Sequence, residues 1–154
     1  MIVINLQTQT LRLGDKQYPV STAKNGAGEV NGSLQTPRGA HEIRAKIGDG
    51  APVNTVFVGR RPNGEIYSPE LAKQSPRHDW ILTRVLWLRG KEWGINRGGN
   101  VDTMRRYIYI HGTPDSVELE KPGSIGCVRM RNRDVVELFD MTAPGMTVMI
   151  VEAE

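Results

Sequence analysis

The chain has 154 residues, of which 38% are hydrophobic, so it is long enough for one domain with a buried core and too apolar for a disordered protein. The formal charge is +3, and the sequence has no run of five or more Lys and Arg residues, which argues against nucleic acid as a partner. The single cysteine excludes an intramolecular disulfide, and the lack of CxxC and HExxH patterns argues against a metal site.

The positive charge is concentrated in the second half of the chain. Between Arg84 and Arg133 there are ten Lys and Arg residues and five Asp and Glu residues, a net charge of +5, which leaves −2 for the rest of the chain. A basic region attracts anionic partners, although a solvated protein surface produces the same pattern.

The opening segment, MIVINLQTQT, has no basic stretch, and polar residues interrupt its apolar run. This is not the pattern of a signal peptide or of a transmembrane helix. We therefore expect a cytoplasmic protein without membrane contact. A leader peptide removed earlier would instead place the protein in the periplasm.

Short apolar segments separated by turn residues occur along the whole chain and favour strands over long helices. They predict strands at 2–6, 11–13, 18–21, 40–47, 53–59, 80–88, 107–110 and 147–151. Residues rich in Gly, Asn, Ser and Pro predict long loops at 23–39 and 89–103 and a turn at 62–64, while 67–79 is polar and irregular.

One helix is expected near the C-terminus. Apolar residues recur at helical spacing over 133–141, Asn132 is a suitable N-cap, and Asp134 lies in the first turn, where the helix dipole favours an acid. The sequence contains no internal repeat and no composition shift that marks a domain boundary. It therefore predicts a single mainly β domain over 1–154 with one short helix.

The segment YIYIHGTPDSVELEKPGSIGCVRMRN carries the candidate chemistry. Gly123 and Gly126 stand close to Cys127 and suit a tight turn that exposes the thiol. Arg129 and Arg131 follow closely, and positive charge favours a thiolate. The competing interpretation is that Cys127 is a small buried apolar residue, as lone cysteines often are.

A cysteine nucleophile needs a base, because a thiol is only partly ionised at neutral pH. His111 stands at the end of a predicted strand, from which the following loop can return Cys127 to meet it. The alternatives are His41, in a predicted strand, and His78, in a polar stretch. Spacing favours His111, although a histidine at this kind of position is also often structural.

The backbone N–H groups of Gly126 and Cys127 are expected to stabilise an oxyanion, because they belong to the turn that presents the thiol. Arg129 is a candidate for bidentate binding of a substrate carboxylate, with a solvated surface position as the alternative. A thiol, an imidazole and backbone amides suffice for acyl transfer, so we expect no cofactor.

The motif HGTP followed by SIGCVRMRN, with TPRG upstream, resembles the L,D-transpeptidase catalytic domain of the YkuD type. The similarity covers nearly the whole chain, since the opening strands, YPVSTA, TPRG, YIYIHG and SIGCVRM occur in the family order. The resemblance implies a β-sandwich or barrel domain that acts on peptidoglycan stem tetrapeptides. The bond cleaved would join an L-centre to the terminal D-Ala.

The resemblance also implies a role for each residue of the motif. Cys127 matches the nucleophile, His111 the base, and Gly112 the residue whose backbone carbonyl orients the imidazole in place of an Asp side chain. Ser124 and Arg129 match the rest of the signature and are expected to contact substrate.

Thr36 and Gly39 match the TPxG motif of the family, which we interpret as architectural. The chain departs from the family pattern at Ile125, where the family often has His. This departure leaves the base in place and predicts a more apolar rim for the site. The loop between His111 and Ser124 holds twelve residues and is short for the family.

A thioester on Cys127 has two fates in this family. Water gives an L,D-carboxypeptidase that trims tetrapeptides in murein recycling, and an amine acceptor gives a transpeptidase that cross-links peptidoglycan or exchanges D-amino acids. Because the sequence shows no export signal or second domain, we expect hydrolysis. A module that binds muropeptides without turnover is the alternative outside enzymes. Inhibition by carbapenem-type β-lactams is implied by the resemblance alone.

Overall fold

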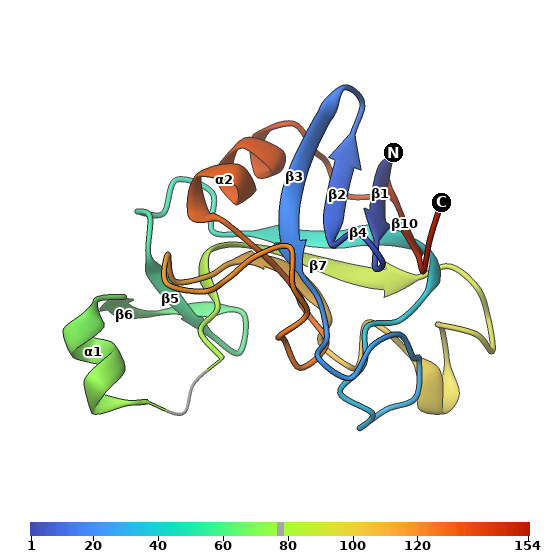
Figure 1. Ribbon diagram of the computed structural model, residues 1–154, viewed down its shortest axis with the longest axis horizontal. Coiled ribbons are helices and arrows are strands. Elements are labelled where there is room, and N and C mark those ends of the chain that lie inside the picture. The colour runs from blue at the N-terminus through green and yellow to red at the C-terminus, as the bar shows by residue number, and fades with distance from the viewer. Residues whose placement is uncertain (77–78) are drawn as a thin grey trace.

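The computed structural model describes residues 1–76 and 79–154, and strands build most of it (Figure 1). The strands are β1 (Ile2–Asn5), β2 (Thr10–Leu13), β3 (Lys16–Ser21), β4 (Gly39–Ile47), β5 (Thr55–Val58), β6 (Arg61–Ile66), β7 (Leu82–Gly90), β8 (Tyr109–Gly112), β9 (Val128–Met130) and β10 (Thr147–Val151). The helical segments within these ranges are α1 (Pro69–Gln74), the 3-10 helix η1 (Gly99–Val101) and α2 (Asn132–Asp140). None of these described helices is both long and apolar enough to cross a membrane.

The strands of the described ranges form one sheet that closes on itself. Its order is β4-β10-β1-β2-β3-β9-β8-β7-β5-β6, and β4 also pairs with β7, which completes a ring and leaves β5 and β6 outside it. The pairs β1–β10 and β8–β9 are parallel. Closure removes the exposed edges of the ring strands. The predicted mainly β sandwich or barrel fold is therefore confirmed.

The interior of the ring and one face of α2 share a single apolar core. The helix contributes Val135, Leu138 and Phe139, which pack with strand residues that include Leu86 and Ile110. The apolar spacing in the sequence predicted this buried face correctly. Burying the helix against the strands is what fixes its position next to β7 and β8.

The turn predicted at 62–64 is wrong, because these residues lie inside β6. The β5–β6 hairpin turns instead at Gly59 and Arg60, which have φ angles of 56° and 66°. Two consecutive residues with positive φ form the two-residue connection that matches the twist of a hairpin. Arginine is not a typical turn residue, so the sequence does not indicate a turn at Arg60.

The segment predicted as irregular, 67–79, contains the short helix α1. Ser68 caps it by accepting a hydrogen bond from the Leu71 N–H at 3.1 Å, and Pro69 occupies its first turn. Ser followed by Pro is a helix-start signal. The signal was missed because none of the helix residues is buried, so the segment has no apolar face.

The helix predicted over 133–141 is α2, but the predicted cap is wrong. Arg131 occupies the N-cap position without a side-chain cap bond. The buried Asn132 side chain instead accepts a hydrogen bond from Thr83 Oγ1 at 2.7 Å and donates to Asn54 Oδ1 at 3.0 Å. The amide thus joins α2 to β7 and to the loop before β5.

Asn132→Ala is expected to destabilise the protein by about 1–3 kcal/mol, because it removes the acceptor of the buried Thr83 hydroxyl and the donor to the half-buried Asn54 side chain. Urea unfolding measures the change. Arg133→Ala is the matched control, since its side chain is 87% exposed and its loss should change stability by less than about 0.5 kcal/mol. Equal stabilities of the two variants would contradict the proposed role of the Asn132 amide.

Candidate active site

Strands β7, β8 and β9 lie side by side and position the predicted catalytic residues. In the parallel β8–β9 pair, His111 is the partner of Arg129. Side chains alternate along a strand, so Tyr109 and His111 share one face of β8. Arg129 of β9 and Cys127, which directly precedes β9 and packs with Tyr109, lie on the corresponding face. The intervening Ile110 points into the barrel core. The register therefore brings Cys127 and His111 to the same face of the sheet.

His111 is fully buried, and its Nδ1 lies 2.6 Å from the carbonyl oxygen of Gly112. A carbonyl can only accept a hydrogen bond, so Nδ1 carries the ring proton and Nε2 of the neutral ring keeps its lone pair. Nε2 has no hydrogen-bond partner in the described part of the chain. Burial lowers the pKa of His111, while Asp79 raises it. The ring is therefore a neutral base with a free nitrogen.

Cys127 is 9% exposed and is held by two backbone groups. Its Sγ lies 3.4 Å from the Tyr107 carbonyl oxygen, to which it donates, and accepts from the Tyr109 N–H at 3.3 Å. Burial raises the pKa of the Cys127 thiol to about 12, and Asp79 adds to this rise, whereas the Tyr109 N–H opposes it. The resting group is thus a thiol, with its proton directed at Tyr107 rather than at His111.

Two guanidinium groups oppose the effect of burial and lower the pKa of Cys127. They belong to Arg106 and Arg129. Arg131, which the sequence paired with Arg129, lies exposed at the start of α2. Arg106 takes that role instead: it is partly buried and donates to the Gln35 carbonyl oxygen at 2.6 Å. No motif marks Arg106, because loop packing alone brings it to the thiol.

Arg129 is held between Asp79 and Gly123. Its Nε lies 3.3 Å from Asp79 Oδ1, and its Nη2 donates to the Gly123 carbonyl oxygen. The pair borders a pocket of about 230 Å³, where Ile125 is 57% exposed and forms the apolar rim that the sequence predicted. The pocket is lined by Asp79, Trp80, Thr113, Pro114, Val117, Ile125 and Arg129. Asp79 was missed by the sequence analysis, since it lies in the segment predicted as irregular.

The turn that presents the thiol is closed by Ser124. The Gly126 N–H donates to Ser124 Oγ at 3.1 Å, and Ser124 Oγ donates to the Cys127 carbonyl oxygen at 2.6 Å. The Ser124 hydroxyl is buried within these contacts, so its predicted contact with substrate stays a prediction. The Gly126 amide is likewise engaged. Of the two predicted oxyanion donors, the Cys127 N–H is therefore the one that this turn does not occupy through Ser124.

Gly112 occupies a position that admits no side chain. A Cβ at this residue would lie 2.3 Å from Asn132 Oδ1 and 2.6 Å from the Leu82 carbonyl oxygen. The neighbouring Thr83 has a φ of 75°, a conformation that β-branched residues rarely adopt. This tight packing fixes the Gly112 carbonyl, which orients the His111 ring as the family motif implies.

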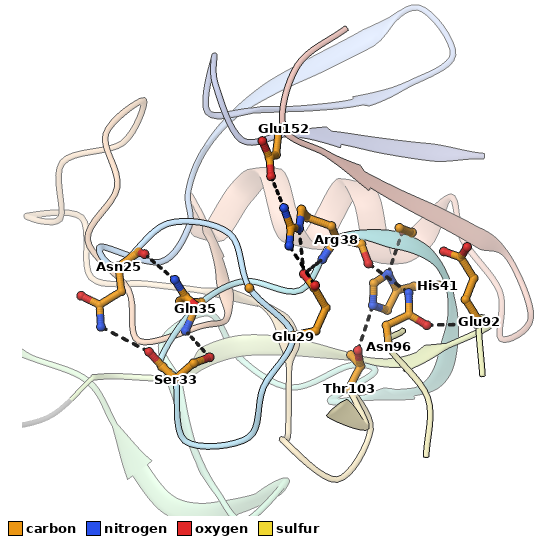
Figure 2. Close-up of polar contacts among 12 residues, drawn as sticks. Asn25, Glu29, Ser33, Gln35, Arg38, His41, Glu92, Asn96, Thr103 and Glu152 are labelled. Atoms are coloured by element: carbon orange, nitrogen blue, oxygen red, sulfur yellow. Dashed lines mark hydrogen bonds and ion pairs between the residues drawn. The ribbon is translucent and has the colours of Figure 1, made fainter. Parts of the chain in front are cut away.

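The loop over 23–39 packs against the Cys127 turn. Thr36 Oγ1 donates to the Gly126 carbonyl oxygen at 2.9 Å and accepts from the Ala23 N–H at 3.0 Å. Figure 2 shows the polar side chains that hold the loop in shape, in two groups: Asn25, Ser33 and Gln35, and Glu29, Arg38 and Glu152. These contacts fit the predicted architectural role of Thr36.

Gly39 and the alternative base His41 belong to a separate buried network (Figure 2). His41 Nδ1 donates to the Gly39 carbonyl oxygen at 3.0 Å, and Nε2 accepts from Thr103 Oγ1 at 2.9 Å. Burial lowers the pKa of His41 to about 4, so the ring is neutral and both nitrogens are engaged. A Cβ on Gly39 would lie 2.3 Å from Glu92 Oε2. His78, the other alternative, lies outside the described residues.

A family model described as the L,D-transpeptidase catalytic domain (YkuD) matches residues 1–151. The chain belongs to this L,D-transpeptidase family. A Bacillus licheniformis protein named "Putative L,D-transpeptidase YkuD" is 28% identical over 149 residues, which make up 97% of this chain and 64% of that protein. The resemblance inferred from the HGTP, SIGCVRM and TPRG motifs is therefore confirmed.

Solved L,D-transpeptidases share the fold. The enzyme from Xylanimonas cellulosilytica superposes with a TM-score of 0.58 and 18% identity over 97% of this chain and 58% of that chain. L,D-transpeptidase 3 from Mycobacterium tuberculosis, solved with a faropenem-derived adduct, gives a TM-score of 0.56 and 14% identity over 98% of this chain and 59% of that one. This L,D-transpeptidase family member thus spans less than two thirds of each relative.

Alkylation of Cys127 by iodoacetamide is expected to rise about tenfold per pH unit between roughly pH 6 and 10, without a plateau. The reason is that only the thiolate reacts, and burial raises the thiol pKa to about 12, so the thiolate fraction is small below that pH and grows as pH rises. Intact mass reports this residue alone, since the sequence has one cysteine. A plateau near neutral pH would mean that a thiolate–imidazolium pair exists in the resting protein.

Proposed function

We propose that this chain is a cysteine enzyme that cleaves peptidoglycan stem tetrapeptides between the L-centre and the terminal D-Ala, through a thioester on Cys127. One observation carries the proposal: the bond from His111 Nδ1 to the Gly112 carbonyl leaves Nε2 unprotonated and unpartnered among the described residues, on the face that Cys127 shares. A buried thiol with a raised pKa needs such a base at the moment of attack.

The first half of the reaction acylates the enzyme. The thiol proton turns from the Tyr107 carbonyl to His111 Nε2, and Nε2 takes it as Sγ attacks the carbonyl carbon of the L-centre. The Cys127 amide stabilises the negative oxygen of the tetrahedral intermediate. The C–N bond to D-Ala then breaks, and the imidazolium returns its proton to the leaving amine. A thioester remains on Cys127.

The second half of the reaction releases the acyl group. His111 Nε2 takes a proton from the incoming nucleophile, which attacks the thioester carbonyl, and the same proton returns to Sγ when the C–S bond breaks. With water as nucleophile the product is a tripeptide, and the protein is an L,D-carboxypeptidase. With an amine as nucleophile a new peptide bond forms. We propose hydrolysis, the outcome expected from the sequence, with transpeptidation as the alternative.

Substrate recognition is assigned to Arg129 and the pocket beside it. The guanidinium lies on the same face as His111, pairs electrostatically with Asp79 and borders the 230 Å³ pocket, with N–H donors beyond the one that bonds Gly123. A stem peptide carries carboxylates, which arginine binds in a bidentate way. The net positive charge of the surrounding half of the chain supports attraction of such an anionic substrate.

The same thiol is proposed to react with carbapenem-type β-lactams. The solved relatives include LdtMt1 in complex with imipenem, at 19% identity and a TM-score of 0.55. Opening of a β-lactam ring by a thiol gives the same kind of acyl-enzyme, with attack at a carbonyl and an oxyanion that needs the same amide donor.

Incubation with a tetrapeptide ending in D-Ala is expected to release D-Ala and to give a tripeptide, detected by mass spectrometry. Cys127→Ala should abolish the reaction, and His111→Ala should reduce its rate by about 100-fold or more, because both the base and the acid are lost. A ligated product in the presence of an added amine would establish transpeptidation instead. No turnover of tetrapeptide under either condition would contradict the enzyme assignment and favour a muropeptide-binding module.

Arg129→Ala is expected to raise KM for the tetrapeptide by roughly tenfold or more, because a charge-assisted contact with a substrate carboxylate is lost. Steady-state kinetics of D-Ala release measures the effect. Arg131→Ala removes the same charge two residues away, at an exposed position, and should leave KM within about twofold. Equal KM values for the two variants would remove Arg129 from the substrate site.

A further inference from the structure

The peptide unit between Gly126 and Cys127 holds two groups that matter for catalysis. Its N–H belongs to Cys127 and is the proposed oxyanion donor, and its carbonyl belongs to Gly126. Gly126 has a φ of +136°, a conformation that side chains rarely adopt and that glycine reaches at little cost. Local backbone preference alone therefore does not fix the orientation of this peptide unit. Contacts with other parts of the chain are needed to fix it.

Two hydroxyl groups, those of Ser124 and Thr36, hold different peptide units of this turn by hydrogen bonds. Ser124 Oγ accepts from the Gly126 N–H and donates to the Cys127 carbonyl, so it fixes the peptide units on either side of the Gly126–Cys127 unit. The central unit is held by Thr36, whose Oγ1 donates to the Gly126 carbonyl at 2.9 Å from ninety residues away in the chain.

A trans peptide is planar, and its C=O and N–H point in opposite directions. The Thr36 hydroxyl on the Gly126 carbonyl therefore also sets the direction of the Cys127 N–H. We infer that Thr36 is a positioning residue that aims the Cys127 amide at the oxyanion of the acylation step. The inference rests on the proposed function, and it gives the Thr of the TPRG motif a task beyond architecture.

Thr36 is itself held rigidly enough to perform this task. Its side chain is fully buried, its N–H donates to the Gly26 carbonyl at 3.0 Å, and its carbonyl accepts from the Gly28 N–H at 2.9 Å. The preceding Gln35 carbonyl accepts from Arg106 at 2.6 Å and would lie 3.4 Å from a Cβ on Gly126. The loop is thus held by its own hydrogen bonds and by Arg106 where it contacts the Cys127 turn.

Two reactions of the same thiol separate positioning of the amide from positioning of the sulfur. Iodoacetamide is attacked at a saturated carbon: Sγ loses its proton, forms a bond to the CH₂ group, iodide leaves, and no oxyanion develops. p-Nitrophenyl acetate is attacked at a carbonyl: an oxyanion forms, p-nitrophenolate leaves, and an acetyl thioester remains. Only the second reaction depends on where the Cys127 amide points.

The test compares the full-length wild-type chain with Thr36→Val, which has the same shape without the hydroxyl, and with Thr36→Ser, which keeps it. Thr36→Val is expected to slow acylation by p-nitrophenyl acetate on the order of ten- to hundredfold, and alkylation by less than about twofold. Thr36→Ser is expected to restore most of the acylation rate. Thr103→Val is the matched control, because it removes another buried threonine hydroxyl, which bonds His41 and not the Cys127 turn. Circular dichroism checks that each variant is folded.

Equal acylation rates for wild type and Thr36→Val would overturn the inference, and so would a parallel loss of both reactions that Thr36→Ser fails to reverse. If Thr36→Val does not fold, Thr36→Ser alone decides, since it must keep the ratio of acylation to alkylation at the wild-type value. Failure of the proposed function gives a different signature: the wild type reacts with p-nitrophenyl acetate but does not cleave the tetrapeptide.

Discussion

The parallel pairing of β8 with β9 is the contact on which the site depends. It sets the register that puts His111 and Cys127 on one face, although a loop separates them in the chain. β8 also pairs with β7, and β9 with β3, so both strands are held from both sides within the closed ring. The proposed catalytic pair thus lies in or directly next to strands that cannot shift without breaking the barrel, while the loops around it remain free to vary.

The electrostatics of the resting site favour neutral groups. Burial acts against the charged form of both side chains, raising the pKa of the Cys127 thiol and lowering that of His111. Arg106 and Arg129 stabilise a thiolate, and Asp79 stabilises an imidazolium, so the surroundings offset part of the cost of separating charge. The arrangement fits a nucleophile that is activated by its base during attack rather than one that is stored as an ion pair.

Sequence reasoning predicted most of the barrel strands and the buried face of α2 correctly, because these depend on periodicity. The catalytic roles of Cys127, His111 and Gly112 stay a prediction from short motifs, and the register is consistent with it by placing Cys127 and His111 on one face. Sequence reasoning failed where tertiary contacts decide. Strand β9 is three residues long and directly follows the thiol, so it has no pattern of its own. Asn132 looked like a helix cap, yet its amide serves a buried network. Asp79 and Arg106 approach the site from the segments before β7 and β8, and no sequence pattern marks either of them.

The group that orients His111 is a main-chain oxygen rather than a carboxylate. It holds the tautomer without placing a negative charge beside the ring, so it does little to stabilise the imidazolium through charge. It also has no side chain of its own to remove. Side-chain removal therefore reports only on Cys127 and His111. Gly112→Ala adds a Cβ against Asn132 Oδ1 and the Leu82 carbonyl instead of removing the orienting oxygen, so only chemical replacement of the Gly112–Thr113 amide isolates its contribution.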